Sequence, residues 1–142
     1  MKVYAESSAV LSWLLGESAG QSVRTVLAGA ETVVASDLTV VECHRALIRA
    51  ARIEALTEAQ LADRRAHLAQ AATGWHLLRV SREVAERARQ PFPFEPLRTL
   101  DALHLASALT ARASVPGLAL LTLDERVRRN GRELGFSVSP KQ

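Results

Sequence analysis

Short apolar runs alternate along the chain with longer segments in which apolar residues recur at helical spacing. The short runs are apolar throughout rather than at every second position, which is typical of strands buried on both faces. We expect strands at residues 3–5, 32–35, 75–80 and 118–122, with a weaker run at 136–138. The helical spacing predicts helices at about 7–15, 19–28, 37–53, 57–73, 99–113 and 124–134, and a further helix after Ser81.

Short polar residues and glycines mark the expected ends of these helices. A side-chain oxygen at the first position accepts a hydrogen bond from a free backbone N–H, and glycine suits the position after the last turn. The residues 91–96 contain three prolines and predict a loop. Candidate caps are Ser7 or Ser8, Ser36 or Asp37, Thr57 in a capping box with Gln60, Ser81 and Thr99; candidate stops are Gly16, Gly74 and Gly135.

Strands that alternate with helices predict an α/β fold in which a parallel sheet is covered on both faces. We therefore expect a three-layer sandwich with a central, mostly parallel sheet of four to five strands. The 142 residues fit one domain, 1–142. In such sheets ligands bind beyond the carboxyl ends of the strands, where the connections diverge to opposite faces.

Composition narrows the setting of the protein. No apolar run approaches the ~20 residues needed to span a bilayer, so we expect no membrane partner, and the single cysteine, Cys43, suits a reducing cytoplasm. The formal net charge is +3, and sixteen of the eighteen basic residues are arginine, whose rigid fork suits phosphate. A GC-rich genome explains the arginine content equally well, so charge alone decides little.

Four acidic residues fall where the predicted sheet places a ligand site. Glu6 directly follows the first expected strand, and Asp124 lies just past the apolar part of the fourth. Asp101 lies in the first turn of its helix and Glu42 in the early part of another, and both helix starts face the same edge of the sheet. The four acids are therefore expected to converge.

Each acid taken alone also has a structural explanation. Glu42 lies opposite the expected apolar stripe of its helix, beside Arg45 and Arg49, as in a surface salt bridge. Asp101 matches the helix dipole, and Asp124 can cap its helix. The stripes assumed to face the core are Val40, Cys43, Leu47 and Ala50 in one helix, and Ala102, Ala106, Leu109 and Ala113 in the other, which leaves Asp101, His104 and Arg112 opposite.

The four acids together favour a metal site over four separate explanations. Clustered carboxylates repel one another, and a divalent cation neutralises them. Ligands that are all oxygen favour Mg²⁺ or Mn²⁺ over zinc. Such a site activates water for the hydrolysis of phosphodiesters. An NTP-binding module is disfavoured because the chain has no glycine-rich phosphate loop.

The order and spacing of four segments resemble the PIN domain, and in particular the VapC-type toxins of prokaryotic toxin–antitoxin pairs. The segments are VYAESSAVLSWLLGES, SDLTVVECHRAL, TLDALHLASAL and LLTLDERVRRNGRELGF, and the resemblance covers nearly the whole chain. It implies a Mg²⁺- or Mn²⁺-dependent endoribonuclease, the toxin of a type II system, that hydrolyses RNA. It also implies a homodimer and inhibition by a cognate VapB-type antitoxin whose tail occupies the groove. The family's catalytic and metal-binding quartet maps onto Glu6, Glu42, Asp101 and Asp124, with supporting hydroxyls at Ser7 and Thr122.

Position 6 departs from the family pattern, which has aspartate there. Glu6 still offers a carboxylate, but its extra methylene displaces it by about 1.5 Å, and Mg²⁺ tolerates misplacement poorly. We expect metal binding to survive with reduced cleavage. The alternative is a catalytically weakened protein that acts by binding RNA or its antitoxin.

Four further residues lie near the expected site. His104 follows Asp101 by three positions, and a structural hydrogen bond is favoured over a role as ligand. Arg98, Arg45 and Arg49 can hold an RNA backbone or balance the carboxylates, and the sequence leaves both roles open.

Overall fold

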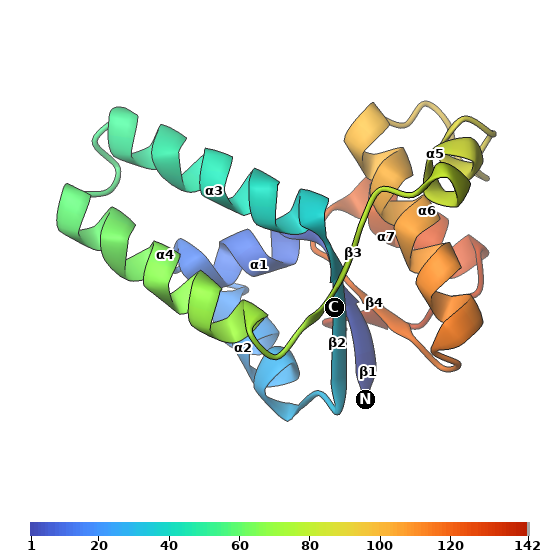
Figure 1. Ribbon diagram of the computed structural model, residues 1–142, viewed down its shortest axis with the longest axis horizontal. Helices are drawn as coiled ribbons and strands as arrows, with labels where there is room; N and C mark the ends of the chain where they lie inside the picture. Colours follow the sequence, from blue (N-terminus) through green and yellow to red (C-terminus); the bar gives the residue numbers. More distant parts are fainter. Residues whose placement is uncertain (142) are drawn as a thin grey trace.

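The computed structural model describes residues 1–141 and contains one fully parallel sheet (Figure 1). Its five strands within these residues lie in the order β3-β2-β1-β4-β5. The predicted strands are confirmed, most of them within a residue or two. Their bounds are β1 Lys2–Ala5, β2 Thr32–Ser36, β3 His76–Leu78, β4 Ala119–Leu121 and β5 Val138–Ser139.

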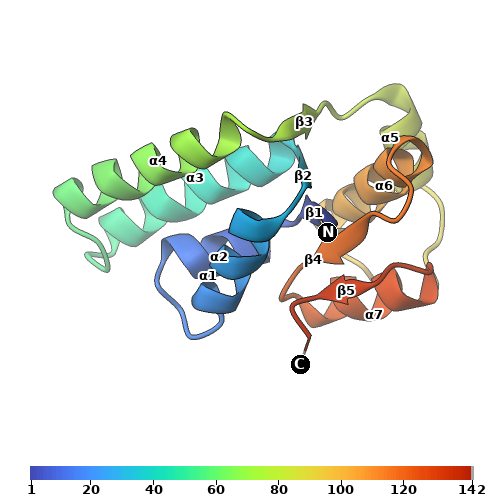
Figure 2. The same ribbon diagram turned by 90° about the horizontal axis from the view of Figure 1, so that it is seen from below.

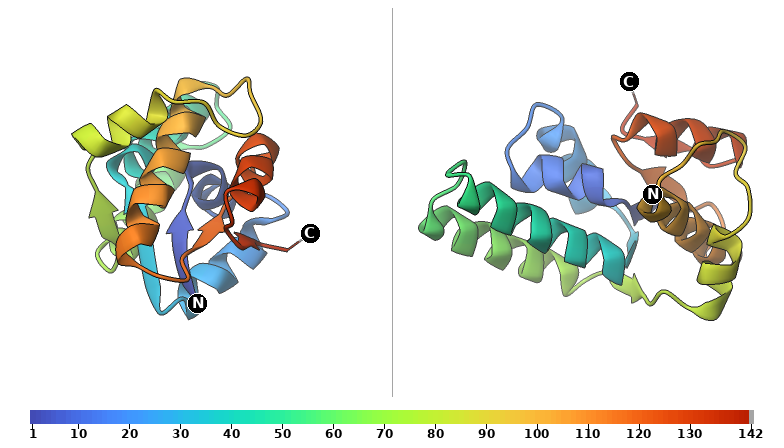
Figure 3. Two further views of the ribbon diagram at one scale, coloured as in Figure 1. Left: turned by 90° about the vertical axis from the view of Figure 1, so that its right-hand side faces the viewer. Right: turned by 90° about the horizontal axis from the view of Figure 1, so that it is seen from above.

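Helices cover both faces of this sheet, which confirms the three-layer sandwich. One layer holds α1 (Ser7–Leu14), α2 (Gly20–Gly29), α3 (Asp37–Arg52) and α4 (Glu58–Ala72). The other holds α5 (Arg82–Ala88), α6 (Thr99–Ser114) and α7 (Glu125–Glu133). Figure 2 and the right-hand view of Figure 3 show α3 and α4 side by side and extending beyond the sheet.

The strands are apolar throughout because each face of the sheet has its own core. Val3 and Ala5 of β1 pack toward α1–α4, whereas Tyr4 between them packs toward α5–α7. The same alternation holds in β2 and β4, where Val34 and Leu120 share the face of Tyr4. The periodicity of two is therefore present, but it separates two buried faces rather than a buried face from a solvated one.

Most of the predicted helix boundaries are confirmed. Ser36 and Ser81 cap α3 and α5, and Thr57 forms the expected capping box with Gln60 at α4. Gly16 (φ 68°) follows the end of α1 in the left-handed backbone region that glycine tolerates best.

Two helix starts differ from the prediction. The cap of α1 is Glu6 rather than Ser7 or Ser8, because the longer Glu6 side chain turns back to accept the Ser8 N–H. At α6 the cap position is held by Arg98 without a side-chain hydrogen bond, and Thr99 is the first helical residue. At the start of α6, Arg98 forms an ion pair with Asp101, and no hydroxyl side chain caps the helix.

The assumed buried faces of two helices also need correction. In α3 the buried residue near the start is Thr39 rather than Val40, because the Thr39 hydroxyl donates a hydrogen bond to the carbonyl of Ala5 at 3.0 Å. In α6, Asp101 and His104 are buried, contrary to the helical-wheel prediction, whereas Ala113 is exposed. The wheel assumed one covered face, but α6 packs against the sheet, α5 and α7.

Within residues 1–141, none of the helices combines the length and the apolarity that crossing a membrane requires.

Candidate active site

The connections that follow the neighbouring strands β1 and β4 diverge to opposite faces of the sheet. The chain leaves β1 into α1 on one face and leaves β4 into α7 on the other, so the carboxyl ends of these strands border a crevice. A pocket of about 420 Å³ lies at this edge. The four predicted acids all line it, together with Arg98: they are Glu6, Glu42, Asp101 and Asp124. The four side chains thus line one pocket, as the sequence led us to expect.

Glu6 is buried at the end of β1, and its peptide N–H extends the ladder by donating to Leu121 O at 2.9 Å. Its Oε2 accepts hydrogen bonds from the Thr122 hydroxyl at 2.7 Å, from the Ser8 N–H at 3.1 Å and from the Ser8 hydroxyl. Oε1 accepts no hydrogen bond from any residue in the range 1–141. One oxygen of the carboxylate is therefore fixed by the protein, and the other is left for a ligand.

Ser8, expected from the sequence only as a candidate helix cap, connects the segments that follow β1 and β4. Its Oγ accepts hydrogen bonds from the N–H groups of Leu123, at 2.9 Å, and Asp124, at 3.1 Å. The same hydroxyl contacts Glu6, so it sets the loop after β4 relative to the carboxylate after β1. A serine two residues after the acid, at the start of a helix, was its only signal in the sequence.

Glu42 lines the pocket from α3. It lies one helical turn after Thr39, whose hydrogen bond to Ala5 O holds α3 at the end of β1. Its Oε1 accepts hydrogen bonds from the Ser7 hydroxyl, at 2.6 Å, and from His104 Nε2. Burial alone raises the pKa of Glu42, but the hydrogen bonds from His104 and Ser7 and the nearby charges outweigh it, so the pKa is held below its usual value. Glu42 is thus an ionised ligand candidate at neutral pH.

Asp101 and Asp124 are joined by Arg98. The guanidinium donates to Asp101 through Nε, at 2.9 Å to Oδ2, and through Nη2, at 3.1 Å to Oδ1. Nη2 also lies 2.9 Å from Asp124 Oδ2, while Asp124 Oδ1 caps α7 by accepting the Val127 N–H. The hydrogen bond to Asp101 and the charges of both aspartates raise the pKa of Arg98. The sequence left two roles open for Arg98, contact with RNA and neutralisation of the carboxylates. In the structure its guanidinium neutralises Asp101 and Asp124.

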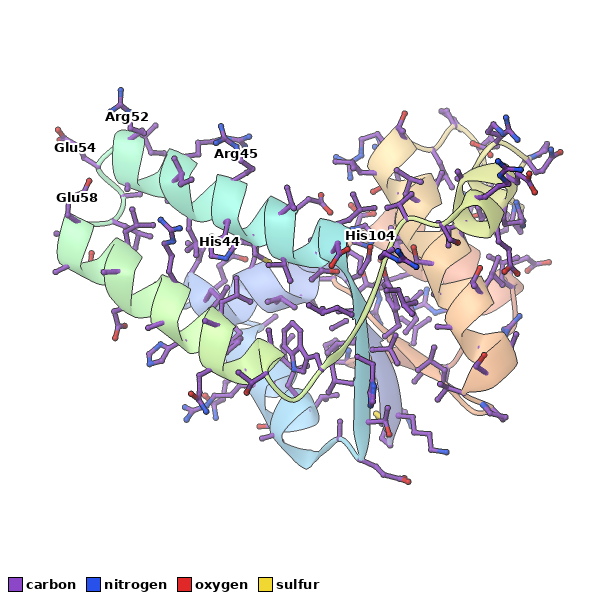
Figure 4. The ribbon with its side chains drawn as sticks, viewed as in Figure 1. His44, Arg45, Arg52, Glu54, Glu58 and His104 are labelled. Carbon is purple, nitrogen blue, oxygen red and sulfur yellow. The ribbon has the colours of Figure 1, made fainter. Side chains whose placement is uncertain are left out.

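His104 is buried and makes the expected structural hydrogen bonds. Its Nε2 donates to Glu42 and lies 3.1 Å from Ser7 Oγ, and its Nδ1 is hydrogen-bonded to the hydroxyl of Tyr4 at 2.8 Å. Figure 4 shows His104 between α3 and α6. The role of Tyr4 was missed, because its partner lies 100 positions away and nothing local in the sequence connects them.

The loop after β4 is fixed by a buried arginine. Arg128 of α7 donates to Thr122 O at 2.7 Å and to Pro140 O at 2.8 Å. It therefore ties the segment that carries Thr122 and Asp124 to the strand end at the C-terminal side. Burial lowers the pKa of Arg128.

Two of the predicted RNA-contacting residues lie outside the pocket. Arg45 and Arg49 are exposed on α3, three and seven residues after Glu42, and neither forms an ion pair with any residue from 1 to 141. Figure 4 shows Arg45 and Arg52 projecting from the side of α3 away from α4.

The side chains that line the pocket suit a hard divalent cation, which prefers oxygen ligands. Four carboxylates line the pocket, and Arg98 is the one basic side chain among the lining residues that the structure describes. In the described part of the chain, however, no three His, Cys, Asp or Glu side chains stand close enough to hold an ion as they are placed. The contacts above explain this spacing: Arg98 lies between Asp101 and Asp124, and Glu6 is drawn toward Thr122. A cation would therefore have to displace the Arg98 guanidinium.

Comparison with known proteins agrees with this architecture. The family model for the PIN domain matches residues 3–133. Ribonuclease VapC46 of Mycobacterium tuberculosis is 36% identical over 138 residues, covering 96% of this chain and 95% of that protein. Among solved structures, a toxin–antitoxin complex from Klebsiella pneumoniae has a TM-score of 0.64 at 17% identity and covers 100% of this chain and 99% of its own. The M. tuberculosis toxin VapC20, described as cleaving the sarcin–ricin loop, has a TM-score of 0.66 at 14% identity, with 95% and 96% covered. The chain therefore belongs to the PIN domain family, among the VapC-type proteins.

Proposed function

We propose that the protein is a divalent-metal-dependent endoribonuclease and the toxin of a type II toxin–antitoxin pair. The observation that carries the proposal is the pocket at the β1–β4 edge, which four carboxylates line from separate elements of the fold. Relatives that cover nearly the whole chain and are named as ribonucleases support the choice of RNA as substrate.

Glu6, Glu42, Asp101 and Asp124 would together hold Mg²⁺ or Mn²⁺ through oxygen atoms. When bound, the ion supplies an activated water and stabilises the leaving oxygen of a phosphodiester. The chain's own residues prepare the ligands: Ser7 and His104 hold Glu42, and Thr122 holds Glu6. Arg98, once released from the aspartates, is placed at the pocket to contact a phosphate.

The RNA backbone would be held by arginines on the rim of the site. Arg45 and Arg49 lie on the same side of α3 as Glu42, because residues three and seven positions apart fall on one helix face. Both are exposed and form no ion pair with the described residues, so their donors are available to phosphate. Contacts of this kind give affinity without base specificity.

We also propose a cognate VapB-type antitoxin and a second copy of the chain as partners, in the cytoplasm. A toxin–antitoxin complex among the structural neighbours supports the antitoxin. Two exposed apolar side chains, Val41 on α3 and Ile53 directly after this helix, are available for contact with a protein partner.

Incubation of the purified protein with total RNA and transfer RNA tests the proposal. We expect discrete cleavage products with Mg²⁺ or Mn²⁺ and none with a chelator. Asp101→Asn should abolish cleavage, whereas Asp63→Asn, an exposed acid paired with Arg64 outside the pocket, should leave it unchanged. Cleavage that persists in chelator or in Asp101→Asn would contradict the proposal.

The same variant separates cleavage from binding in cells. If Asp101→Asn inhibits growth as strongly as the wild type, the protein acts by binding RNA or its antitoxin, and the weakened-enzyme alternative replaces the proposal.

A further inference from the structure

Two polar side chains are buried beneath the pocket on the face of the sheet that carries α5–α7. Tyr4 comes from the centre of β1 and His104 from the second turn of α6, and both are almost completely inaccessible to solvent. Their rings meet edge to face, with centroids 6.0 Å apart and an interplanar angle of 70°. Burial of polar groups is costly unless each finds a hydrogen-bond partner. Tyr4 is hydrogen-bonded to His104, and His104 is hydrogen-bonded to Glu42.

The donors and acceptors of this network can be assigned in one direction. The Glu42 carboxylate only accepts, so the N–H of His104 must be on Nε2 to donate to it. In the neutral imidazole Nδ1 is then an acceptor, and the Tyr4 hydroxyl, 2.8 Å away, is its donor. Tyr4 thus selects the tautomer in which His104 serves Glu42.

The contacts leave Glu42 with two unequal oxygens. Oε1 is held by His104 and by the Ser7 hydroxyl, whereas Oε2 accepts no hydrogen bond from the residues that the structure describes. The carboxylate lines the pocket and is partly exposed, so Oε2 is accessible from it. When a carboxylate is hydrogen-bonded through one oxygen, its other oxygen points in a defined direction. Residues that hydrogen-bond to a metal ligand orient that ligand in this way.

We infer that Tyr4 and His104 form a positioning relay that orients Glu42 for a divalent cation. The inference rests on the proposed function and extends it to two residues that touch neither the ion nor RNA. Any buried histidine needs partners for its ring nitrogens, but one that only fills the core would not need a carboxylate that lines the pocket as a partner. Here each nitrogen is engaged, and the relay runs from the middle of β1 to a candidate ligand.

Two conservative substitutions test the relay. Tyr4→Phe removes only the hydroxyl and keeps the ring, and His104→Gln keeps an N–H donor near Glu42 without the aromatic ring. Removing partners that orient metal ligands typically costs 10- to 100-fold in affinity or activity. We expect Tyr4→Phe to weaken Mn²⁺ binding about tenfold, His104→Ala to weaken it more, and His104→Gln to recover part of that loss.

Ser12→Ala is the matched control. Its buried hydroxyl donates to Ala9 O within α1, outside the pocket, so its loss removes a buried hydrogen bond without touching the relay. Mn²⁺ affinity is measured by calorimetry on metal-free protein, with circular dichroism to verify folding. RNA cleavage is followed in parallel. We expect kcat to fall in Tyr4→Phe while KM for RNA stays within about twofold of the wild-type value, because neither Tyr4 nor His104 is hydrogen-bonded to the arginines proposed to hold RNA.

The double variant gives the sharpest result. If Tyr4 acts only through His104, Tyr4→Phe has no further effect in the His104→Ala background. Additive losses, or wild-type Mn²⁺ affinity in both Tyr4→Phe and His104→Gln, would overturn the relay while leaving the proposed function intact. If the wild type binds no Mn²⁺, the relay and the proposed function both fail. If His104→Ala does not fold, Tyr4→Phe alone decides, because it preserves the volume of the core.

Discussion

Replacing Arg98 by glutamine should tighten the binding of a divalent cation. Arg98 donates to Asp101 at 2.9 and 3.1 Å and to Asp124 at 2.9 Å, so an incoming ion must break these contacts. The Arg98 side chain is 63% exposed, and solvent screening limits each such pair to about 0.5–1 kcal/mol. Two carboxylates then give about 1–2 kcal/mol, which corresponds to a decrease in Kd of about 5- to 30-fold.

Calorimetric titration of metal-free protein with Mn²⁺ measures this effect. Arg126→Gln is the matched control, since Arg126 is also exposed, forms no ion pair with residues 1–141 and does not line the pocket. The difference between Arg98→Gln and the control should shrink at high salt, because screening weakens the ion pairs that Arg98 makes. An unchanged or weaker Mn²⁺ affinity in Arg98→Gln would refute the view that the guanidinium competes with the ion.

Three further predictions concern the acid after β1, the loop after β4 and the rim. Glu6→Asp should raise the rate of RNA cleavage, because the shorter side chain restores the family's ligand position, and an unchanged rate would contradict this reasoning. Arg128→Ala should lower the free energy of unfolding in urea by about 3 kcal/mol, since two hydrogen bonds from a charged donor are lost, whereas Arg126→Ala should change it by less than about 0.5 kcal/mol. Arg45→Ala and Arg49→Ala should each reduce the salt dependence of RNA binding by about 0.7 in the log–log slope without changing kcat, and a slope equal to that of the wild type would exclude a phosphate contact.

The sheet and the place of the site could be predicted from the sequence because both depend on local patterns. Continuous apolar runs predict buried parallel strands whatever their neighbours are, and in such a sheet the carboxyl ends of all strands share one edge. Glu6 and Asp124 follow directly from that rule, since each comes just after a strand. Asp101 and Glu42 required the further assumption that the helices start at the same edge, and the pocket contains both.

The predictions were wrong or incomplete where the burial or the hydrogen bonds of a side chain depend on residues distant in the sequence. A helical wheel assigns one buried face, so it placed Asp101 and His104 in solvent, whereas α6 is covered on several sides. Thr39 replaced Val40 in the core because a distant carbonyl, that of Ala5, accepts its hydrogen bond. The contact between Tyr4 and His104 spans 100 positions and has no local signal.

The central claim is that the four carboxylates hold an ion that cleaves RNA. Its most direct test is one Mn²⁺ titration in which site occupancy, by electron paramagnetic resonance, and the single-turnover cleavage rate are measured in the same samples. We predict that the two curves rise together in the wild type and that both vanish in Asp101→Asn while Asp63→Asn retains them. Cleavage without bound Mn²⁺, or full Mn²⁺ occupancy with no cleavage at any concentration, would contradict the claim.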